Sequence, residues 1–167
     1  MLRDTQIICP TIDECKEVSP ALIKHILVPF DESQISFEAF EFGLDLARKY
    51  NAKISLITII HSGILSSSFI EMSGHQKIIE KEKLRTINSI IQEIQNTAKK
   101  FGVEVKSELV FSQSVAETIL SFSSQRKVDL IVMGTRGRDG SVRYMLGSVT
   151  FDIVQKAKCP VVFVKRK

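Results

Sequence analysis

The stretch His25–Ile60, HILVPFDESQISFEAFEFGLDLARKYNAKISLITII, contains a complete strand–helix–strand unit. Its first six residues, His25–Phe30, form an apolar run that predicts a buried strand, and the polar residues 31–33 then signal a helix start. An amphipathic helix follows, because apolar residues recur at steps of three and four: Phe37, Phe40, Leu44 and Ala47. Asn51 predicts the helix end, and the β-branched run Ile54–Ile60 predicts a second strand. Strand, helix and strand in this order predict a parallel pair.

The same alternation continues through the middle of the chain. A polar, Ser-rich loop over residues 61–74 precedes a long helix that ends at Gly102, and its apolar stripe is Leu84, Ile87, Ile91, Ile94, Ala98 and Phe101. Residues 103–111 alternate apolar and polar side chains, which predicts a third strand nearer an edge of the sheet. Ser114-Val-Ala-Glu117 has the form of a capping box, and the helix face behind it contains Val115, Ile119 and Phe122.

The last part of the chain completes the pattern with a strand, a helix and a strand. The segments are a strand over residues 129–133, a helix that opens at Ser148, and a fifth strand, Pro160–Val164. We expect the apolar face of that helix to contain Val149, Ile153, Val154 and Ala157. Alternating strands and helices, with strands apolar on both faces, predict an α/β fold: one open five-stranded parallel sheet covered by helices on both sides. Pro29 conflicts with a central strand position and suits a strand end.

Composition favours one ordinary globular domain. The chain has 167 residues, of which 44% are apolar and 25% charged, so it is long enough to bury a core without disulfides or metals. The net charge of +4 is too small and too dispersed to predict a nucleic-acid partner. The three cysteines, Cys9, Cys15 and Cys159, are typical of free thiols in a reducing compartment.

Residues 1–22 have no sustained period and contain Pro10 and Pro20, so we interpret them as an extension and residues 23–167 as the domain. No apolar run has the length of a membrane span, and charged residues interrupt any signal-peptide pattern near the start. We therefore expect a cytoplasmic protein with no membrane partner.

The segment after the fourth strand is the best candidate for ligand chemistry. It reads GTRGRDGSVRYMLGS over residues 134–148, with glycines at 134, 137, 140 and 147. Glycine lets backbone N–H groups approach a phosphate closely, and Gly147-Ser148 opens a helix whose free N–H groups favour an anion. Three arginines against Asp139 leave the segment at net +2. Ligands of parallel sheets bind beyond the carboxyl ends of strands, so these features predict a triphosphate site there.

Two familiar phosphate-binding patterns are absent from the sequence. There is no G-x-x-x-x-G-K-[ST] segment, and the first strand leads into Pro29-Phe-Asp-Glu-Ser33 instead of G-x-G-x-x-G. The spacing Gly134-x2-Gly137-x9-Gly147-Ser148 instead resembles the ATP-binding signature of the universal stress protein family. The opening ILVPFDES over residues 26–33 and the closing CPVVFV over residues 159–164 look like that family in the same order, so the resemblance covers about residues 23–165.

The resemblance implies the strand order 3-2-1-4-5, an adenine-nucleotide alpha hydrolase-like arrangement, and a homodimer paired through the last strand, Pro160–Val164. It also implies ATP, with Mg²⁺ as a companion ion. By matching positions, Pro29 and Asp31 would line the adenosine end, and Ile59 would contact the adenine through its backbone. The pocket wall and phosphate contacts would come from Met133, Gly134, Arg136, Gly137, Gly147, Ser148 and Val149. One departure is Asp139, where the family often has a small or hydroxyl residue; a carboxylate there would either repel phosphate or coordinate a divalent ion.

Structural roles compete with each of these assignments. Asp31, Ser33 and Ser148 all precede or open helices and suit helix caps. Single glycines and arginines in a loop serve turns and solvation more often than ligands. His25, His61 and His75 lack metal-ligand spacing, and His25 suits a structural role.

The sequence leaves three possible functions: an ATP-binding regulatory module, a slow ATPase of the same fold, and a dimeric interaction protein with an empty pocket. Hydrolysis needs a positioned water and usually Mg²⁺, and the sequence assigns no catalytic base. The glycine series favours the first function, a module that binds ATP without rapid turnover.

Overall fold

The structure, a computed structural model, describes residues 22–61, 74–135 and 147–165, without the side chains of residues 61 and 74–80. Strands and helices alternate through these residues. The strands are β1 (His25–Pro29), β2 (Lys53–His61), β3 (Val105–Ser112), β4 (Leu130–Gly134) and β5 (Val161–Val164). The helices are α1 (Gln34–Tyr50), α2 (Gly74–Lys100), α3 (Val115–Gln125) and α4 (Ser148–Lys156).

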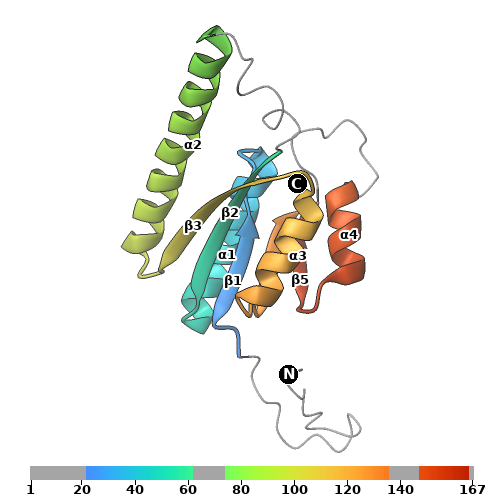
Figure 1. The fold of residues 1–167 in the computed structure, drawn as a ribbon. Helices are drawn as coiled ribbons and strands as arrows, with labels where there is room; N and C mark the ends of the chain where they lie inside the picture. The colour runs from blue at the N-terminus through green and yellow to red at the C-terminus, as the bar shows by residue number, and fades with distance from the viewer. Residues whose placement is uncertain (1–21, 62–73, 136–146, 166–167) are drawn as a thin grey trace, which may run out of the picture.

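The strands form one parallel sheet in the order β3-β2-β1-β4-β5 (Figure 1). β1 pairs with β2 from His25↔Lys53 to Pro29↔Ile57, and with β4 through Ile26↔Leu130 and Leu27↔Ile131. Both the α/β fold class and the order 3-2-1-4-5 are therefore confirmed. Pro29 is the last residue of β1, the strand end that its missing N–H suits.

One face of the sheet packs against α1 and α2. The buried side chains of this core come from β1, β2, β4 and both helices, and include Ile26, Val28, Phe40, Leu44, Ile54, Ile87, Ile94 and Ala98. The expected stripe of α1 is confirmed, as are Ile87, Ile91, Ile94 and Ala98 in the stripe of α2. Two residues of the expected α2 stripe were wrong, because Leu84 and Phe101 are not part of this core. Phe101 lies just beyond the end of α2 and is 49% exposed, with Arg48 stacked over its ring at 5.1 Å.

The other face of the sheet packs against α3 and α4, which Figure 1 shows in front of the strands. Its core includes Leu27, Ile57, Ile119, Phe122, Ile131, Met133 and Ile153. The expected face of α4 was partly wrong. Val154 is 51% exposed, whereas Thr150 and Ile153 are the buried residues of α4. With about 100° between successive residues, Val149, Ile153 and Thr150 lie within a sector of about 100° around the helix, and Val154 lies about 40° beyond that sector.

Local signals set most helix ends. Ser33 caps α1 by accepting a hydrogen bond from the Ser36 N–H, and Ser114 caps α3 by accepting one from the Glu117 N–H. Asn51 ends α1 in the left-handed region at φ 50°, and Gly102 follows α2 at φ 74°. The strands differ from expectation by one or two residues at their ends. Among the described residues, no helix combines the length and apolarity that crossing a membrane requires.

Candidate functional site

The carboxyl ends of β1 and β4 meet where the winding of the sheet changes direction. From β1 the chain adds β2 and then β3 on one side, and afterwards β4 and β5 on the other. The connections after β1 and β4 therefore leave the same edge of the sheet in opposite directions. This arrangement opens a crevice for ligands in parallel sheets.

Two hydrogen bonds between Asp31 and Ser33 hold the segment after β1 in place. Asp31 Oδ1 accepts hydrogen bonds from the Ser33 N–H, at 3.1 Å, and from Ser33 Oγ, at 2.5 Å. Between them, Glu32 has a positive φ of 65°. The capping role expected for Ser33 is therefore present, and Asp31 orients that cap. Asp31 is half-buried at the edge, within reach of the crevice.

Ile59 lies two residues past the point where β1 stops pairing with β2. The Ile57 carbonyl accepts a 2.8 Å hydrogen bond from the Phe30 N–H, so the backbone groups of Ile57 point toward β1. Residues two apart in a parallel strand direct their backbone groups to the same side. The N–H and C=O of Ile59 therefore face the space beyond the end of β1.

The start of α4 is attached to the end of β4 through one carbonyl group. The Thr135 oxygen accepts hydrogen bonds from the Gly147 N–H, at 3.2 Å, and from Thr150 Oγ1, at 3.1 Å. The Thr135 N–H donates to the Val164 oxygen at 3.0 Å, which ties the same residue to β5. Thr135 is 9% exposed and Thr150 2%, so these bonds are shielded from water. They hold the first turn of α4 at the crevice.

The capping role expected for Ser148 was wrong. The N-cap of α4 is Gly147, which makes no side-chain capping bond, and Ser148 is the first helical residue, with an exposed side chain. The first N–H groups of an α-helix have no partner within the helix. Since the cap residue has no side chain to accept from them, the first turn of α4 offers donors with the positive end of the helix dipole.

The predicted site residues separate into three groups. Pro29, Asp31, Ile59 and Gly134 share the carboxyl edge, where Gly147, Ser148 and Val149 also lie. Met133 is 5% exposed and packs in the core under α3 and α4, so only its backbone borders the crevice. Arg136 and Gly137 lie outside the described residues, as does Asp139, and their assignments stay predictions.

Sequence reasoning missed Thr135 and Thr150. The signal for Thr150 was its spacing of three from Ile153, which places a hydroxyl on the buried face of α4. A buried hydroxyl needs a hydrogen-bond partner, and the carbonyl groups at the end of a neighbouring strand are the nearest class of acceptor. No sequence pattern singles out Thr135, because its role depends on its backbone.

Two side chains of the described residues have shifted pKa values, and both lie at the opposite edge of the sheet. Burial lowers the pKa of His25, whose Nδ1 lies 3.1 Å from the Arg126 carbonyl oxygen and whose Nε2 lies 2.7 Å from Ser55 Oγ. Burial also raises the pKa of the Cys159 thiol, and the nearby Asp129 adds to that shift. The structural role expected for His25 is confirmed. Within the described ranges, no three His, Cys, Asp or Glu side chains gather in a metal-binding cluster.

Comparison with known proteins identifies the family. Residues 22–165 match the family model for the universal stress protein family. A universal stress protein of Methanocaldococcus jannaschii is 30% identical over 147 residues, covering 87% of this chain and 84% of the relative.

Two solved structures have the same fold. The universal stress protein UspA from Lactobacillus plantarum superposes with a TM-score of 0.71 at 22% identity, covering 87% of this chain and 99% of its own. A universal stress protein in complex with cAMP superposes at 0.62 with 21% identity, covering 86% and 98%. Because the family model spans nearly the whole described chain and agrees with the strand order, the chain belongs to the universal stress protein family.

Proposed function

We propose that this protein binds ATP at the carboxyl edge of β1 and β4 and acts as a regulatory module of the stress response in the cytoplasm. The phosphates lie against the first turn of α4 and the glycine segment before it. The adenosine lies between the ends of β1 and β2. Binding, and not rapid turnover, is the activity that the site is built for.

The attachment of α4 to Thr135 is the observation that carries the proposal. A phosphate site at a helix start needs free N–H donors held in a fixed place. The buried bonds from Gly147 and Thr150 to the Thr135 oxygen provide the fixed place, and the glycine cap leaves the donors of Ser148 and Val149 without a competing side-chain acceptor from the cap. A Ser, Asp or Asn cap would stabilise this helix start by only about a few tenths of a kcal/mol and would occupy one of these donors.

The adenosine end of the proposed site uses backbone more than side chains. Ile59 offers a donor and an acceptor beyond the end of β1, and Asp31 is held nearby by its bonds to Ser33. A base that matches this donor and acceptor pair satisfies both groups, whereas a different base leaves one unpaired. We therefore expect adenine to be preferred over guanine. The cAMP complex of a protein of the same fold supports an adenine ligand.

Calorimetric titration with ATP and GTP tests the proposal. We expect ATP to bind at least tenfold more tightly than GTP, a difference of about 1.4 kcal/mol. Repeating the titration without Mg²⁺ shows whether the ion binds with the phosphates. Equal affinity for both nucleotides, or no heat with either, would contradict the proposal. Gly137→Val supplies the matched negative control, since a Cβ and its methyl groups would keep the backbone from the phosphates.

A slow ATPase is the second activity to exclude. We expect at most weak phosphate release, because rapid hydrolysis requires a base positioned at the attacking water and the sequence assigns none. A multiple-turnover phosphate-release assay separates the two functions: sustained release would show an enzyme.

We also propose that two copies pair through β5. This strand is last in the sheet order and pairs only with β4 among the described strands. The Pro160 and Val164 oxygens face β4, accepting from Ile131 and Thr135, so the backbone groups of Val161 and Phe163 point outward. An open apolar edge favours pairing with another strand. On the neighbouring helix α4, Phe151 and Val154 are 53% and 51% exposed and extend the apolar surface.

A further inference from the structure

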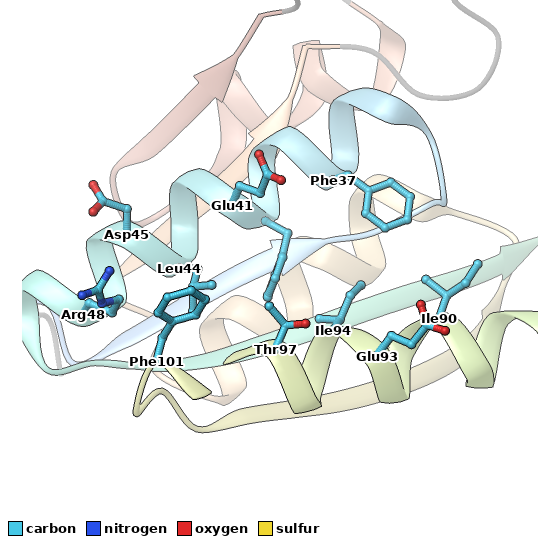
Figure 2. Close-up of a pocket in the computed structure, with 11 residues that line it drawn as sticks. Phe37, Glu41, Leu44, Asp45, Arg48, Ile90, Glu93, Ile94, Thr97 and Phe101 are labelled. Atoms are coloured by element: carbon cyan, nitrogen blue, oxygen red, sulfur yellow. The ribbon is translucent and has the colours of Figure 1, made fainter. Parts of the chain in front are cut away.

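A groove separates α1 from α2 on the face of the sheet that these helices cover (Figure 2). It holds about 490 Å³, and six of its eleven lining residues are apolar. The other five are Glu41, Asp45, Arg48, Glu93 and Thr97. Phe40, Leu44 and Ile94 are buried at its base, while Phe37 and Ile90 are partly exposed along it. An apolar groove of this kind is typical of a surface that another segment covers.

One end of the groove lies where the described chain begins. Arg48 is stacked over the Phe101 ring at 5.1 Å at this end, next to the carboxyl ends of both helices. The Lys53 N–H, just after α1, donates a 3.0 Å hydrogen bond to the Lys24 oxygen. Ile23 packs against the same core that forms the base of the groove, and Leu22 is 72% exposed. The described chain therefore begins on the face, and at the end, where the groove opens.

We propose that residues 1–21 of this chain dock into the groove. Their apolar side chains are concentrated in one stretch, QIICPTI over residues 6–12, which includes Ile7, Ile8 and Ile12. The six residues from Ile7 to Ile12 span about 20 Å when extended. This is enough to cover the α1 segment from Phe37 to Arg48 that lines the groove, which is about 16 Å long. Residues 13–21 form a link of nine residues that spans up to about 30 Å, enough to reach the groove from Leu22.

The charges of the link and of the helix ends support this placement of the segment. The link contains Asp13, Glu14 and Glu17 against Lys16, a net charge of −2. To enter the groove it must pass the last turns of α1 and α2, whose basic residues are Arg48, Lys49, Lys99 and Lys100. When the apolar stretch, residues 6–12, lies over the groove, the acidic link therefore lies next to the basic ends of α1 and α2. A covalent link also raises the local concentration of the segment to about millimolar. This inference goes beyond nucleotide binding and does not depend on it.

Disulfide trapping in the full chain tests the docking. Thr97 lines the groove and is exposed, so Thr97→Cys places a thiol beside the docked position of Cys9. The neighbouring Asn96 is also exposed and does not line the groove, so Asn96→Cys is the matched control. Cys15→Ser and Cys159→Ser remove the other thiols. We expect the intramolecular disulfide to form at least tenfold faster with Thr97→Cys. Equal rates for the two variants would overturn the proposal.

Mixing isotope-labelled and unlabelled chains separates docking within one chain from docking between copies. A disulfide that joins labelled to unlabelled chains would assign the groove to a second copy and overturn the proposal. In the Thr97→Cys background, Glu14→Lys with Glu17→Lys is expected to slow the reaction severalfold, because it reverses the charge of the link.

A dye that fluoresces on exposed apolar surface gives an independent measurement with native cysteines. Ile8→Asp is expected to release the segment and raise the fluorescence at least twofold, whereas Thr11→Asp, a change of similar charge in the same stretch, changes it little. Both residues lie before the described residues, so neither substitution changes a residue of the described core. An Ile8→Asp protein with wild-type fluorescence would contradict the docking.

Discussion

Thr150 Oγ1 donates a 3.1 Å hydrogen bond to the carbonyl oxygen of Thr135, and both residues are buried. The bond joins the first turn of α4 to the end of β4 across fifteen residues of sequence. The Gly147 N–H shares the same acceptor. The position of the proposed phosphate site therefore depends on one backbone oxygen and on a hydroxyl inside the protein.

Replacing Thr150 tests this attachment. Thr150→Val keeps the shape and removes the donor, and we expect it to lower the free energy of unfolding by about 1 to 2 kcal/mol. It should also weaken ATP binding severalfold, because the start of α4 is less firmly held. Thr150→Ser retains the hydroxyl and is the control for affinity. Denaturant unfolding and calorimetry measure the two effects, and wild-type affinity in Thr150→Val would show that the attachment does not position the site.

Ser148 is expected to affect binding without affecting stability. Since Gly147 is the cap and the Ser148 side chain is exposed, Ser148→Ala removes no capping bond. We expect the free energy of unfolding to change by less than about 0.5 kcal/mol. If the hydroxyl donates to a charged phosphate oxygen, ATP affinity falls by about 1.5 to 3 kcal/mol, roughly ten- to hundredfold. A destabilised variant with normal affinity would reverse this assignment.

Pairing through β5 predicts the effect of a proline on the outer side of that strand. Val161→Pro removes an outward N–H while leaving the Pro160 and Val164 carbonyl bonds to β4 in place. We expect a folded monomer, and a dimer for Val161→Ala, which loses similar packing but keeps the N–H. Light scattering at micromolar concentration measures both masses. A dimeric Val161→Pro protein, or a monomeric wild type, would rule out this pairing.

Because of His25, we expect the free energy of unfolding to fall in mild acid. The His25 pKa is lowered below its ordinary value of 6.5, first of all by burial, so the unfolded chain takes up this proton more readily than the folded protein. The stabilisation is complete above pH 6.5 and is lost as the pH falls from there toward the folded-state pKa. The Ser55 hydroxyl donates to Nε2 in the neutral form, with Nδ1–H donating to the Arg126 oxygen.

Urea unfolding at several pH values between about 7.5 and 5 measures this dependence. His25→Gln should be less stable than wild type at the upper pH and should show a flatter decline, since the titrating group is gone. An equal decline in both proteins would place the acid sensitivity on other groups.

Much of the fold was predictable because strand and helix periods are strong in this chain. The apolar runs of β1, β2 and β4 mark a sheet buried on both faces, and Asn51 and Gly102 mark helix ends through their left-handed backbone. The α4 face was less predictable. Val154 is apolar but exposed at the open side of the sheet, while Thr150 is polar but buried through a bond to a distant carbonyl.

The candidate site was predictable only where a local pattern coincides with a strand end. Pro29 ends β1, Asp31 follows it and Gly134 ends β4, so their places at the carboxyl edge followed from the strand pattern. The place of Gly147 at the start of α4 followed from its position before Ser148. Ser148 was misjudged because serine suits a cap, and the cap position depends on where the chain leaves the helix, one residue earlier. The role of Thr135 has no sequence signal, because it uses a backbone oxygen shared by two donors.

The most direct test of the central claim is amide NMR of the wild-type protein during titration with ATP. We expect the largest chemical-shift changes on the backbone amides of Gly134, Thr135, Ser148 and Val149, with Ile59 responding at the adenine end. The α1–α2 groove should remain unaffected. Saturating ATP that leaves these amides unchanged, or that shifts only residues elsewhere, would contradict nucleotide binding at the carboxyl edge of β1 and β4.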